Sequence, residues 1–90
     1  MQDEPIRYSI IVPVYNRPTE IQELLESLSV QTNKVFEVVI VEDGSSEKSD
    51  QVVAAFSDQL EISYYFKPNS GPGDSRNYGM RQAKGNYFLI

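Results

Sequence analysis

The sequence predicts an α/β fold, a doubly wound and mostly parallel sheet that is cut off after about four strands. Apolar runs rich in β-branched residues alternate at regular intervals with segments that have the helical period of 3.6 residues. The apolar runs are continuous rather than alternating in polarity, as in parallel strands that are covered on both faces. The 90 residues are enough for one small domain.

The first βα unit occupies the first third of the chain. A strand is expected at Tyr8–Val14, and Pro13 should mark the place where it leaves the sheet, because proline has no backbone N–H to donate. An amphipathic helix is expected at residues 19–31, and Thr19 with Gln22 has the spacing of a capping box. Its apolar face follows the i, i+3, i+4, i+7 pattern: Ile21, Leu24, Leu25 and Leu28.

The second unit begins with a buried strand at residues 36–41, which ends at the turn formed by residues 42–45. A short helix is expected at residues 51–56, with Ser49 as its cap. A third strand at residues 60–66 alternates more in polarity. That alternation predicts a place nearer the edge of the sheet.

A turn-rich loop at residues 67–73 leads into the third helix. Asp74 can cap this helix, which we expect to run to Lys84, with Gly85 in a left-handed conformation as its stop. Small residues four positions apart would let the helix lie close to the sheet, and they are Gly79 and Ala83. The chain ends in an apolar run at residues 86–90, which we interpret as a fourth strand of a truncated chain.

The composition excludes several classes of function from this chain. It has no cysteine and no histidine, which removes thiol nucleophiles, Ser-His hydrolases and His-ligated zinc. A net charge of −5 disfavours nucleic acid as a partner. No apolar run approaches ~18 residues, and the acidic N-terminus lacks the apolar region of a secretory signal. We therefore expect a cytoplasmic protein. A membrane anchor outside this chain could hold the full-length protein at the inner face of the membrane.

Three polar clusters follow strand ends or begin a helix: Tyr15-Asn16-Arg17, residues 42–45 and residues 69–77. Each has an ordinary explanation as a helix lead-in or a tight turn. In open α/β sheets, however, ligands bind beyond the carboxyl ends of the strands, where the strand order reverses. The coincidence of three clusters at that one edge predicts a binding site there.

The residue types in these clusters suit a nucleotide. Tyr15 offers a flat face for a base, and Asp43 can accept hydrogen bonds from a ring N–H or from ribose hydroxyls. Gly44 allows close approach to the backbone. Arg76 lies near the start of the third helix and can bind phosphate or base oxygens. The alternative for Arg76 is a salt bridge to Asp43 or Asp74.

The chain resembles the family 2 glycosyltransferases in three motifs that occur in order over residues 8–90. These are Ser9-Ile-Ile-Val-Pro-Val-Tyr-Asn16, the turn Glu42-Asp43-Gly44-Ser45 after a Val-Val-Ile-Val strand, and Ser75-Arg76-Asn77-Tyr78-Gly79 followed by Ala83-Lys84-Gly85-Asn86-Tyr87. The resemblance implies a Rossmann-like GT-A fold and an inverting glycosyltransferase. Its donor would be a nucleoside-diphosphate sugar, with UDP the expected nucleotide, and its acceptor a saccharide or a lipid-linked saccharide.

The resemblance also implies which residues bind. Uracil would lie among Pro13, Tyr15 and Asn16, Asp43 would bond the base, and Arg76 would approach it from the other side. Glu42, a longer acid, stands where the family usually has a first Asp. The full expected nucleotide-binding set is Pro13, Val14, Tyr15, Asn16, Arg17, Glu42, Asp43, Gly44, Ser45, Ser75 and Arg76.

Residues 1–90 are thus expected to form the N-terminal nucleotide-sugar-binding part of the glycosyltransferase domain, with no catalytic residue and no metal ligand of their own. The family's divalent metal, Mn²⁺ or Mg²⁺, would be bound by residues beyond Ile90. We expect this chain by itself to be inactive. We also expect Asp43→Ala to abolish UDP binding and to leave the fold intact.

Other classes of protein fit less well. A dinucleotide-binding oxidoreductase needs Gly-x-Gly-x-x-Gly after the first strand, where this chain has Pro-Val-Tyr-Asn-Arg-Pro, and a P-loop enzyme needs Gly-Lys-Ser/Thr. The remaining alternative is a non-catalytic module that binds a nucleotide or associates with itself through exposed strands.

Overall fold

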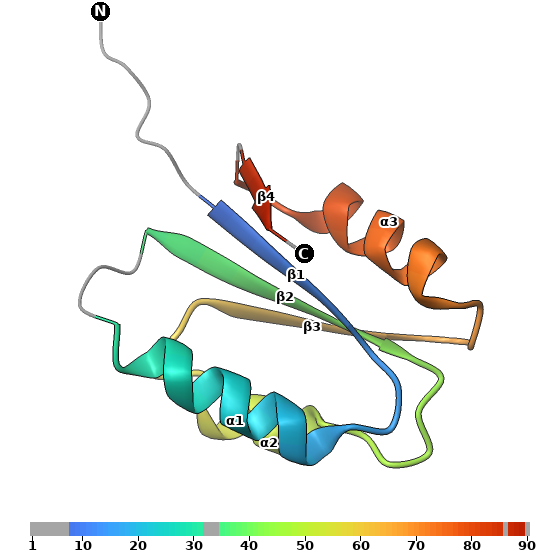
Figure 1. The fold of residues 1–90 in the computed structure, drawn as a ribbon, viewed down its shortest axis with the longest axis horizontal. Helices are drawn as coiled ribbons and strands as arrows, with labels where there is room; N and C mark the ends of the chain where they lie inside the picture. Colours follow the sequence, from blue (N-terminus) through green and yellow to red (C-terminus); the bar gives the residue numbers. More distant parts are fainter. Residues whose placement is uncertain (1–7, 32–34, 86, 90) are drawn as a thin grey trace, which may run out of the picture.

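The computed structural model describes residues 8–31, 35–85 and 87–89. Strands and helices alternate along the chain (Figure 1). Their bounds are β1 (Tyr8–Val14), α1 (Pro18–Ser29), β2 (Phe36–Asp43), α2 (Asp50–Ala55), β3 (Ile62–Lys67), α3 (Pro72–Gln82) and β4 (Tyr87–Leu89). The predicted order of elements is confirmed.

The strands form one four-stranded sheet in the order β3-β2-β1-β4, and every neighbouring pair is parallel. The chain moves outward from β1 through β2 to β3 and then crosses back to place β4 on the other side of β1. The strand order therefore reverses between β1 and β4, which makes that end of the sheet the expected ligand site. The doubly wound sheet is confirmed, as is the place of β3 at an edge of the described sheet.

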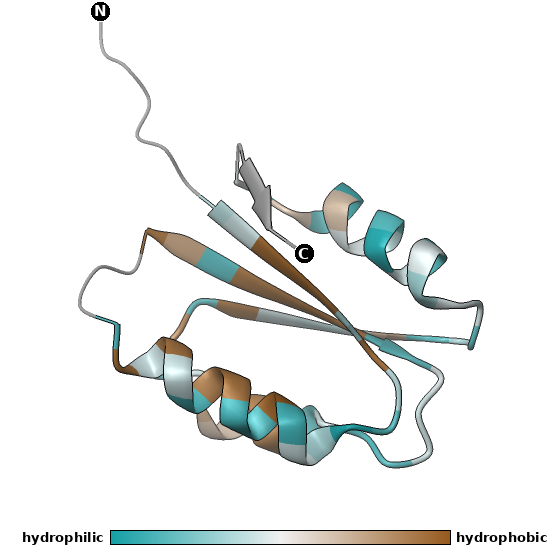
Figure 2. Ribbon diagram, viewed as in Figure 1, coloured by the Kyte–Doolittle hydropathy of each residue, from teal (hydrophilic) through white to brown (hydrophobic). Residues whose placement is uncertain are grey.

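The core has one layer on each face of the sheet, with α1 and α2 on one face and α3 on the other (Figure 1). Alternate residues of β2 point to alternate layers: Val38 and Ile40 pack toward α1 and α2, whereas Val39 and Val41 pack toward α3. Brown and teal residues alternate around α1 in Figure 2, because one side of that helix is buried and the other faces water.

Gly79 sets the distance between α3 and the sheet. A Cβ built on Gly79 would lie only 2.5 Å from Ile11 Cγ2 and 3.2 Å from Val41 Cγ2. A larger residue would push the helix away from β1 and β2, so the expectation of a close approach at Gly79 is confirmed. Ala83 is half-buried against the same apolar layer.

Of the three predicted N-caps, only Ser49 takes the N-cap position. Helix α1 begins at Pro18, after Arg17, so Thr19 lies inside the helix and forms no capping box. Ser49 does precede α2, but its hydroxyl donates to Glu42 and makes no cap hydrogen bond. Asp74 lies in the first turn of α3, and Gly71, at φ 100°, takes the N-cap position.

The end of α3 also differs from the prediction. The helix stops at Gln82, and among the described glycines only Gly44 and Gly71 have positive φ, so Gly85 is not a left-handed stop. Instead the backbone N–H groups of Lys84 and Gly85 donate to the buried carboxylate of Glu37. Glu37 thus provides the acceptor that turns the chain from α3 toward β4.

Strand boundaries differ from the prediction by a few residues. β1 ends at Val14, directly after Pro13, as expected. β2 continues to Asp43, two residues farther than predicted, because Glu42 and Asp43 pair in register with Phe66 and Lys67 of β3. β4 confirms a fourth strand, although residues 86 and 90 of the predicted run lie outside the described part of the chain. None of the described helices has the length and apolar character needed to cross a membrane.

Candidate functional site

A pocket of about 200 Å³ opens at the carboxyl ends of β1 and β2, beside the start of α3. It lies at the edge of the sheet where a doubly wound fold binds its ligands. Its lining residues are Pro13, Val14, Tyr15, Arg17, Asp43 and Pro72. All of them except Pro72 belong to the set predicted from the sequence.

Tyr15 forms the open wall of this pocket. It is 54% exposed, which is unusual for a large aromatic residue at the end of a core strand. An exposed ring beside a pocket offers an unused flat face on which a base can stack. Arg17 lines the same pocket and forms a solvent-exposed salt bridge with Glu20 at 3.0 Å, which holds it only weakly.

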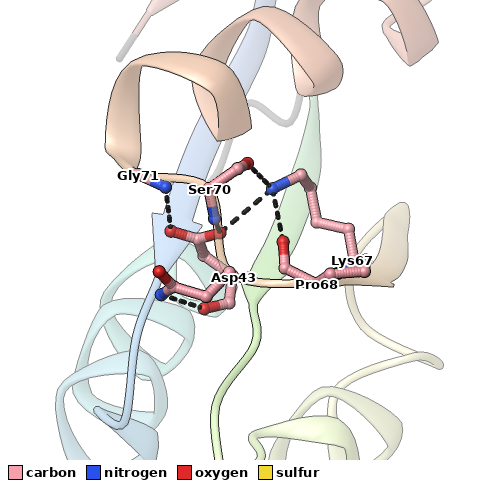
Figure 3. A network of polar contacts seen from close by, with 6 residues as sticks. Asp43, Lys67, Pro68, Ser70 and Gly71 are labelled. Atoms are coloured by element: carbon pink, nitrogen blue, oxygen red, sulfur yellow. Dashed lines mark hydrogen bonds and ion pairs between the residues drawn. The ribbon is translucent and has the colours of Figure 1, made fainter.

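The carboxylate of Asp43 is the polar centre of the site (Figure 3). It is almost fully buried and accepts from Lys67 Nζ at 3.0 Å and from the backbone N–H of Ser70 at 2.8 Å, both on Oδ1. Oδ2 accepts from the backbone N–H of Gly71 at 3.0 Å. Asp43 therefore joins the end of β2 to the loop that starts α3.

This arrangement keeps Asp43 ionised. Burial raises the pKa of the Asp43 carboxyl. The hydrogen bonds from Ser70, Lys67 and Gly71 stabilise the charged form, and their effect on the pKa is larger than that of burial. The pKa of Asp43 is consequently lowered from its ordinary value of 3.8. At neutral pH the group is a negatively charged acceptor at the wall of the pocket.

Lys67 belongs to this polar network, although it was not among the residues predicted from the sequence. Its ammonium donates to Asp43, to the carbonyl oxygen of Pro68 at 2.9 Å and to the hydroxyl of Ser70 (Figure 3). The side chain is only 15% exposed. A signal was present in the sequence, because a lysine at the end of the third strand lies close in the fold to the acid that ends the second.

Gly44 is needed for a contact between loops. It has a φ of 70°, and a Cβ there would lie 2.6 Å from the backbone nitrogen of Asn69. The side-chain amide of Asn69 donates to the carbonyl oxygen of Asp43 at 3.0 Å. The close approach predicted at Gly44 is therefore made by the loop before α3.

Glu42 points away from the pocket, to the face of the sheet that α1 and α2 cover. It is fully buried, and its carboxylate accepts from Ser45 Oγ at 2.5 Å and from Tyr64 Oη at 2.8 Å. The backbone N–H and the hydroxyl of Ser49 add two more hydrogen bonds at 2.8 Å. Four hydrogen bonds thus hold the Glu42 carboxylate within the protein, and Glu42 does not line the pocket.

Asn16 and Ser45 hold the first two loops together. Asn16 has a φ of 54°, a conformation that asparagine tolerates better than most residues. Its backbone N–H donates to Ser45 Oγ at 2.8 Å, and its Oδ1 accepts from the backbone N–H groups of Ser46 and Glu47, both at 2.9 Å. The hydrogen bonds of Asn16 and Ser45 thus join the loop after β1 to the loop after β2 beside the pocket.

Ser75 and Arg76 differ in access. Ser75 is fully buried, and its hydroxyl has no hydrogen-bond partner among the described residues, so its expected contact with a nucleotide is closed off here. Arg76 is partly exposed and forms no ion pair with the described residues, so the alternative of a salt bridge to Asp43 or Asp74 is not observed. Arg76 does not line the pocket, but its Nη2 lies near Gly73, in the first turn of α3.

No group of three or more acidic or histidine side chains in the described part of the chain is arranged to hold a metal ion. The carboxylates at the rim do not fit that role. Asp43 is engaged by an ammonium and two N–H groups, and Glu42 by hydroxyls and an N–H group.

Comparison with known proteins agrees with this fold. An uncharacterised glycosyltransferase of Rickettsia typhi is 40% identical over 80 residues, which is 89% of this chain and 24% of the relative. The structure of TarS residues 1–349 from Staphylococcus aureus is similar, with a TM-score of 0.85 and 39% identity over 93% of this chain. A structure of the same TarS region in complex with UDP-GlcNAc has a TM-score of 0.83 and 39% identity, again over 93% of this chain.

The chain spans about a quarter of the length of these relatives. The sequence model of glycosyl transferase family 2 matches residues 9–90, which is nearly the whole chain. The fold, the relatives and the family match agree, and the chain belongs to glycosyl transferase family 2.

Proposed function

We propose that residues 1–90 form the part of a glycosyltransferase domain that binds the nucleotide of a UDP-sugar donor. The whole protein would transfer the sugar to a saccharide or lipid-linked acceptor with inversion at the anomeric carbon. The observation that carries the proposal is that Tyr15 and Asp43 line one pocket at the edge where the strand order reverses.

In the proposed complex the base stacks on the exposed ring of Tyr15. Uracil has a single ring N–H between two carbonyl groups, and Asp43 is an ionised acceptor that lines the same pocket. The TarS structure with UDP-GlcNAc supports uridine as the nucleoside, since that protein matches 93% of this chain. Pro13, Val14 and Pro72 supply apolar contacts at the sides of the base.

The diphosphate would lie toward the start of α3. The N-terminus of an α-helix favours anions, because its first N–H groups have no partner within the helix and the helix dipole is positive there. Arg76 projects near Gly73 and is not paired with another described residue, so its guanidinium is available to phosphate oxygens. Arg17, held only by an exposed pair with Glu20, is a second cation at the pocket.

We propose an indirect role for the other predicted residues, which do not line the pocket. Glu42, Ser45 and Asn16 hold the rim in place through hydrogen bonds. Gly44 admits the Asn69 backbone, and Ser75 is a buried residue of α3 itself. We propose that these residues shape the nucleotide pocket and make no side-chain contact with the ligand.

The remaining parts of the proposed reaction lie outside this chain. We propose that a divalent metal, Mn²⁺ or Mg²⁺, neutralises the diphosphate and that residues beyond Ile90 hold it. The acceptor site and the catalytic base would also lie beyond Ile90. The 90-residue chain would then be inactive by itself. We place the whole protein in the cytoplasm, at the inner face of the membrane where the acceptor is lipid-linked.

Self-association through exposed strands is a separate proposal for this chain. β3 has a neighbour on one side only within the described sheet, so its other edge presents unpaired backbone groups. Sedimentation velocity over a wide concentration range tests this proposal. A sedimentation coefficient that rises with concentration supports it, and a constant monomer value contradicts it.

The binding experiment compares two exposed aromatic residues. Tyr15 is 54% exposed at the pocket, and Phe66 is 47% exposed on β3 and does not line the pocket. We expect Tyr15→Ala to weaken UDP binding about tenfold or more, as loss of a base–aromatic stack does. Phe66→Ala should leave the affinity unchanged. If UDP does not bind the unaltered chain, or if both variants lose affinity equally, the assignment of Tyr15 is wrong.

A further inference from the structure

The number of free acceptor sites on Asp43 restricts what a ligand can place against it. An ionised carboxylate has about four lone-pair sites for hydrogen bonds. Three are used within the protein, by Lys67 Nζ, by the Ser70 N–H and by the Gly71 N–H. About one site therefore remains for a ligand in the pocket that Asp43 lines.

Of the three internal donors, only Lys67 is a side chain. The Ser70 and Gly71 donors are backbone groups that every residue other than proline would supply. The side chain at position 67 therefore decides how many acceptor sites of the Asp43 carboxylate are used within the protein. This makes Lys67 the one place where a side-chain substitution changes how many acceptor sites the ligand finds.

The Lys67 ammonium is itself fully engaged. It carries three protons and donates to three acceptors, which are Asp43 Oδ1, the Pro68 carbonyl oxygen and the Ser70 hydroxyl. With 15% of its side chain exposed, it has little freedom to turn toward a ligand. Lys67 acts on the pocket through Asp43 and does not serve as a ligand contact of its own.

We infer that Lys67 is a positioning residue that sets the base selectivity of the site by leaving Asp43 one acceptor site for the nucleotide. This inference rests on the proposed function, since it concerns the same pocket. A single site fits uracil, whose pairing edge has one N–H between two carbonyl groups. It does not fit guanine, whose adjacent ring N–H and amino group need two acceptors side by side.

Cytosine is disfavoured for a different reason. Its ring nitrogen at the centre of the pairing edge is an acceptor, which would face the carboxylate of Asp43 with no proton between them. Asp43 therefore selects a base with one N–H donor at the centre of its pairing edge. This distinguishes a uridine nucleotide from guanosine and cytidine nucleotides.

The test is the ratio of affinities for UDP and GDP. The unaltered chain, Lys67→Met and Lys84→Met are labelled with ¹⁵N, and each is titrated with UDP and with GDP while amide shifts are recorded. Lys84→Met is the matched control, because its side chain is exposed and its backbone N–H binds Glu37 at the other end of the sheet. The two lysine variants have the same net charge, so general electrostatic effects on the two nucleotides cancel in the ratio.

We expect the unaltered chain and Lys84→Met to prefer UDP over GDP. In Lys67→Met a second acceptor site opens on Asp43, and the preference should fall about tenfold or more, since a hydrogen bond to a charged group is involved. A merely structural role of Lys67 predicts equal losses for both nucleotides with an unchanged ratio, and that result would overturn the inference.

The remaining outcomes separate this inference from the proposed function. If Lys67→Met does not fold, the unaltered chain still decides the question, because equal affinity for UDP and GDP contradicts the acceptor count. If the unaltered chain binds neither nucleotide, the proposed function fails. If it binds UDP and the ratio does not change in Lys67→Met, the proposed function survives and only the role of Lys67 is rejected.

Discussion

Glu42 and Asp43 are consecutive residues at the end of β2, yet their carboxylates serve opposite faces of the sheet. Glu42 lies on the side of α1 and α2 and accepts from Ser45, Ser49 and Tyr64. Asp43 lies on the side of α3 and accepts from the loop that precedes it. Two adjacent acids therefore hold the loops on both sides of the strand end, and only Asp43 lines the pocket.

Glu42→Gln should destabilise the fold and spare the nucleotide pocket. The neutral amide places an N–H₂ group among donors that now bind carboxylate oxygens, so one end of the network loses its acceptor. We expect a loss of roughly 2 to 4 kcal/mol in the free energy of unfolding, measured by urea denaturation. The affinity of the folded fraction for UDP should stay within about twofold; a large loss of affinity with unchanged stability would contradict this role.

Asp43→Asn should affect both stability and binding. The substitution removes the charge that pairs with the largely buried Lys67 and weakens the acceptor for Ser70 and Gly71. We expect the free energy of unfolding to fall by roughly 2 to 4 kcal/mol, and UDP binding to be lost. This prediction differs from the expectation that Asp43→Ala leaves the fold intact, because Asp43 is buried rather than on a free turn. An Asp43→Asn variant with normal stability would contradict the loop-joining role.

Acid should unfold the chain through these two carboxyls. Their pKa values are lowered in the folded state from ordinary values of 4.5 for Glu42 and 3.8 for Asp43. The unfolded chain therefore binds protons first as the pH falls. The stabilisation is complete above the ordinary values and is lost progressively as the pH drops through the lowered ones. Urea denaturation at a series of pH values should show stability decreasing below about pH 5, with a shallower decrease in Glu42→Gln.

Gly44→Ala should cost more than Gly71→Ala, although both glycines have positive φ. Both substitutions strain the backbone. Only at Gly44 would the new Cβ also collide with a neighbour, the Asn69 backbone at 2.6 Å, whereas nothing lies within 4 Å of the equivalent position on Gly71. We expect roughly 1 to 2 kcal/mol for Gly71→Ala and more for Gly44→Ala by thermal denaturation. Equal losses would show that the contact with Asn69 does not matter.

The apolar elements of this fold were predictable from the sequence. The continuous β-branched run of Tyr8–Val14 and the i, i+4 positions Ile21 and Leu25 report burial directly, because only packed elements need that pattern. Gly79 was predictable for a related reason, since a glycine within a helix usually marks a close approach.

The polar connections were not predictable in the same way. Lys67 and Asp43 are 24 residues apart, and their contact depends on the register of β2 with β3. The same holds for Glu37, whose carboxylate binds backbone groups 47 and 48 residues away. One signal was available, however. The alternation that sends Val38 and Ile40 toward α1 also sends Glu42 there, so its direction away from Asp43 follows from the period of a strand.

Tyr15 and Asp43 line one pocket, which we propose binds a uridine nucleotide. A crystal structure of the chain with UDP tests it most directly. We predict the uracil ring stacked on Tyr15, with its N–H within hydrogen-bond distance of the Asp43 carboxylate and the diphosphate toward the start of α3. A nucleotide bound elsewhere on the molecule, or in this pocket with its base away from both residues, would contradict the claim.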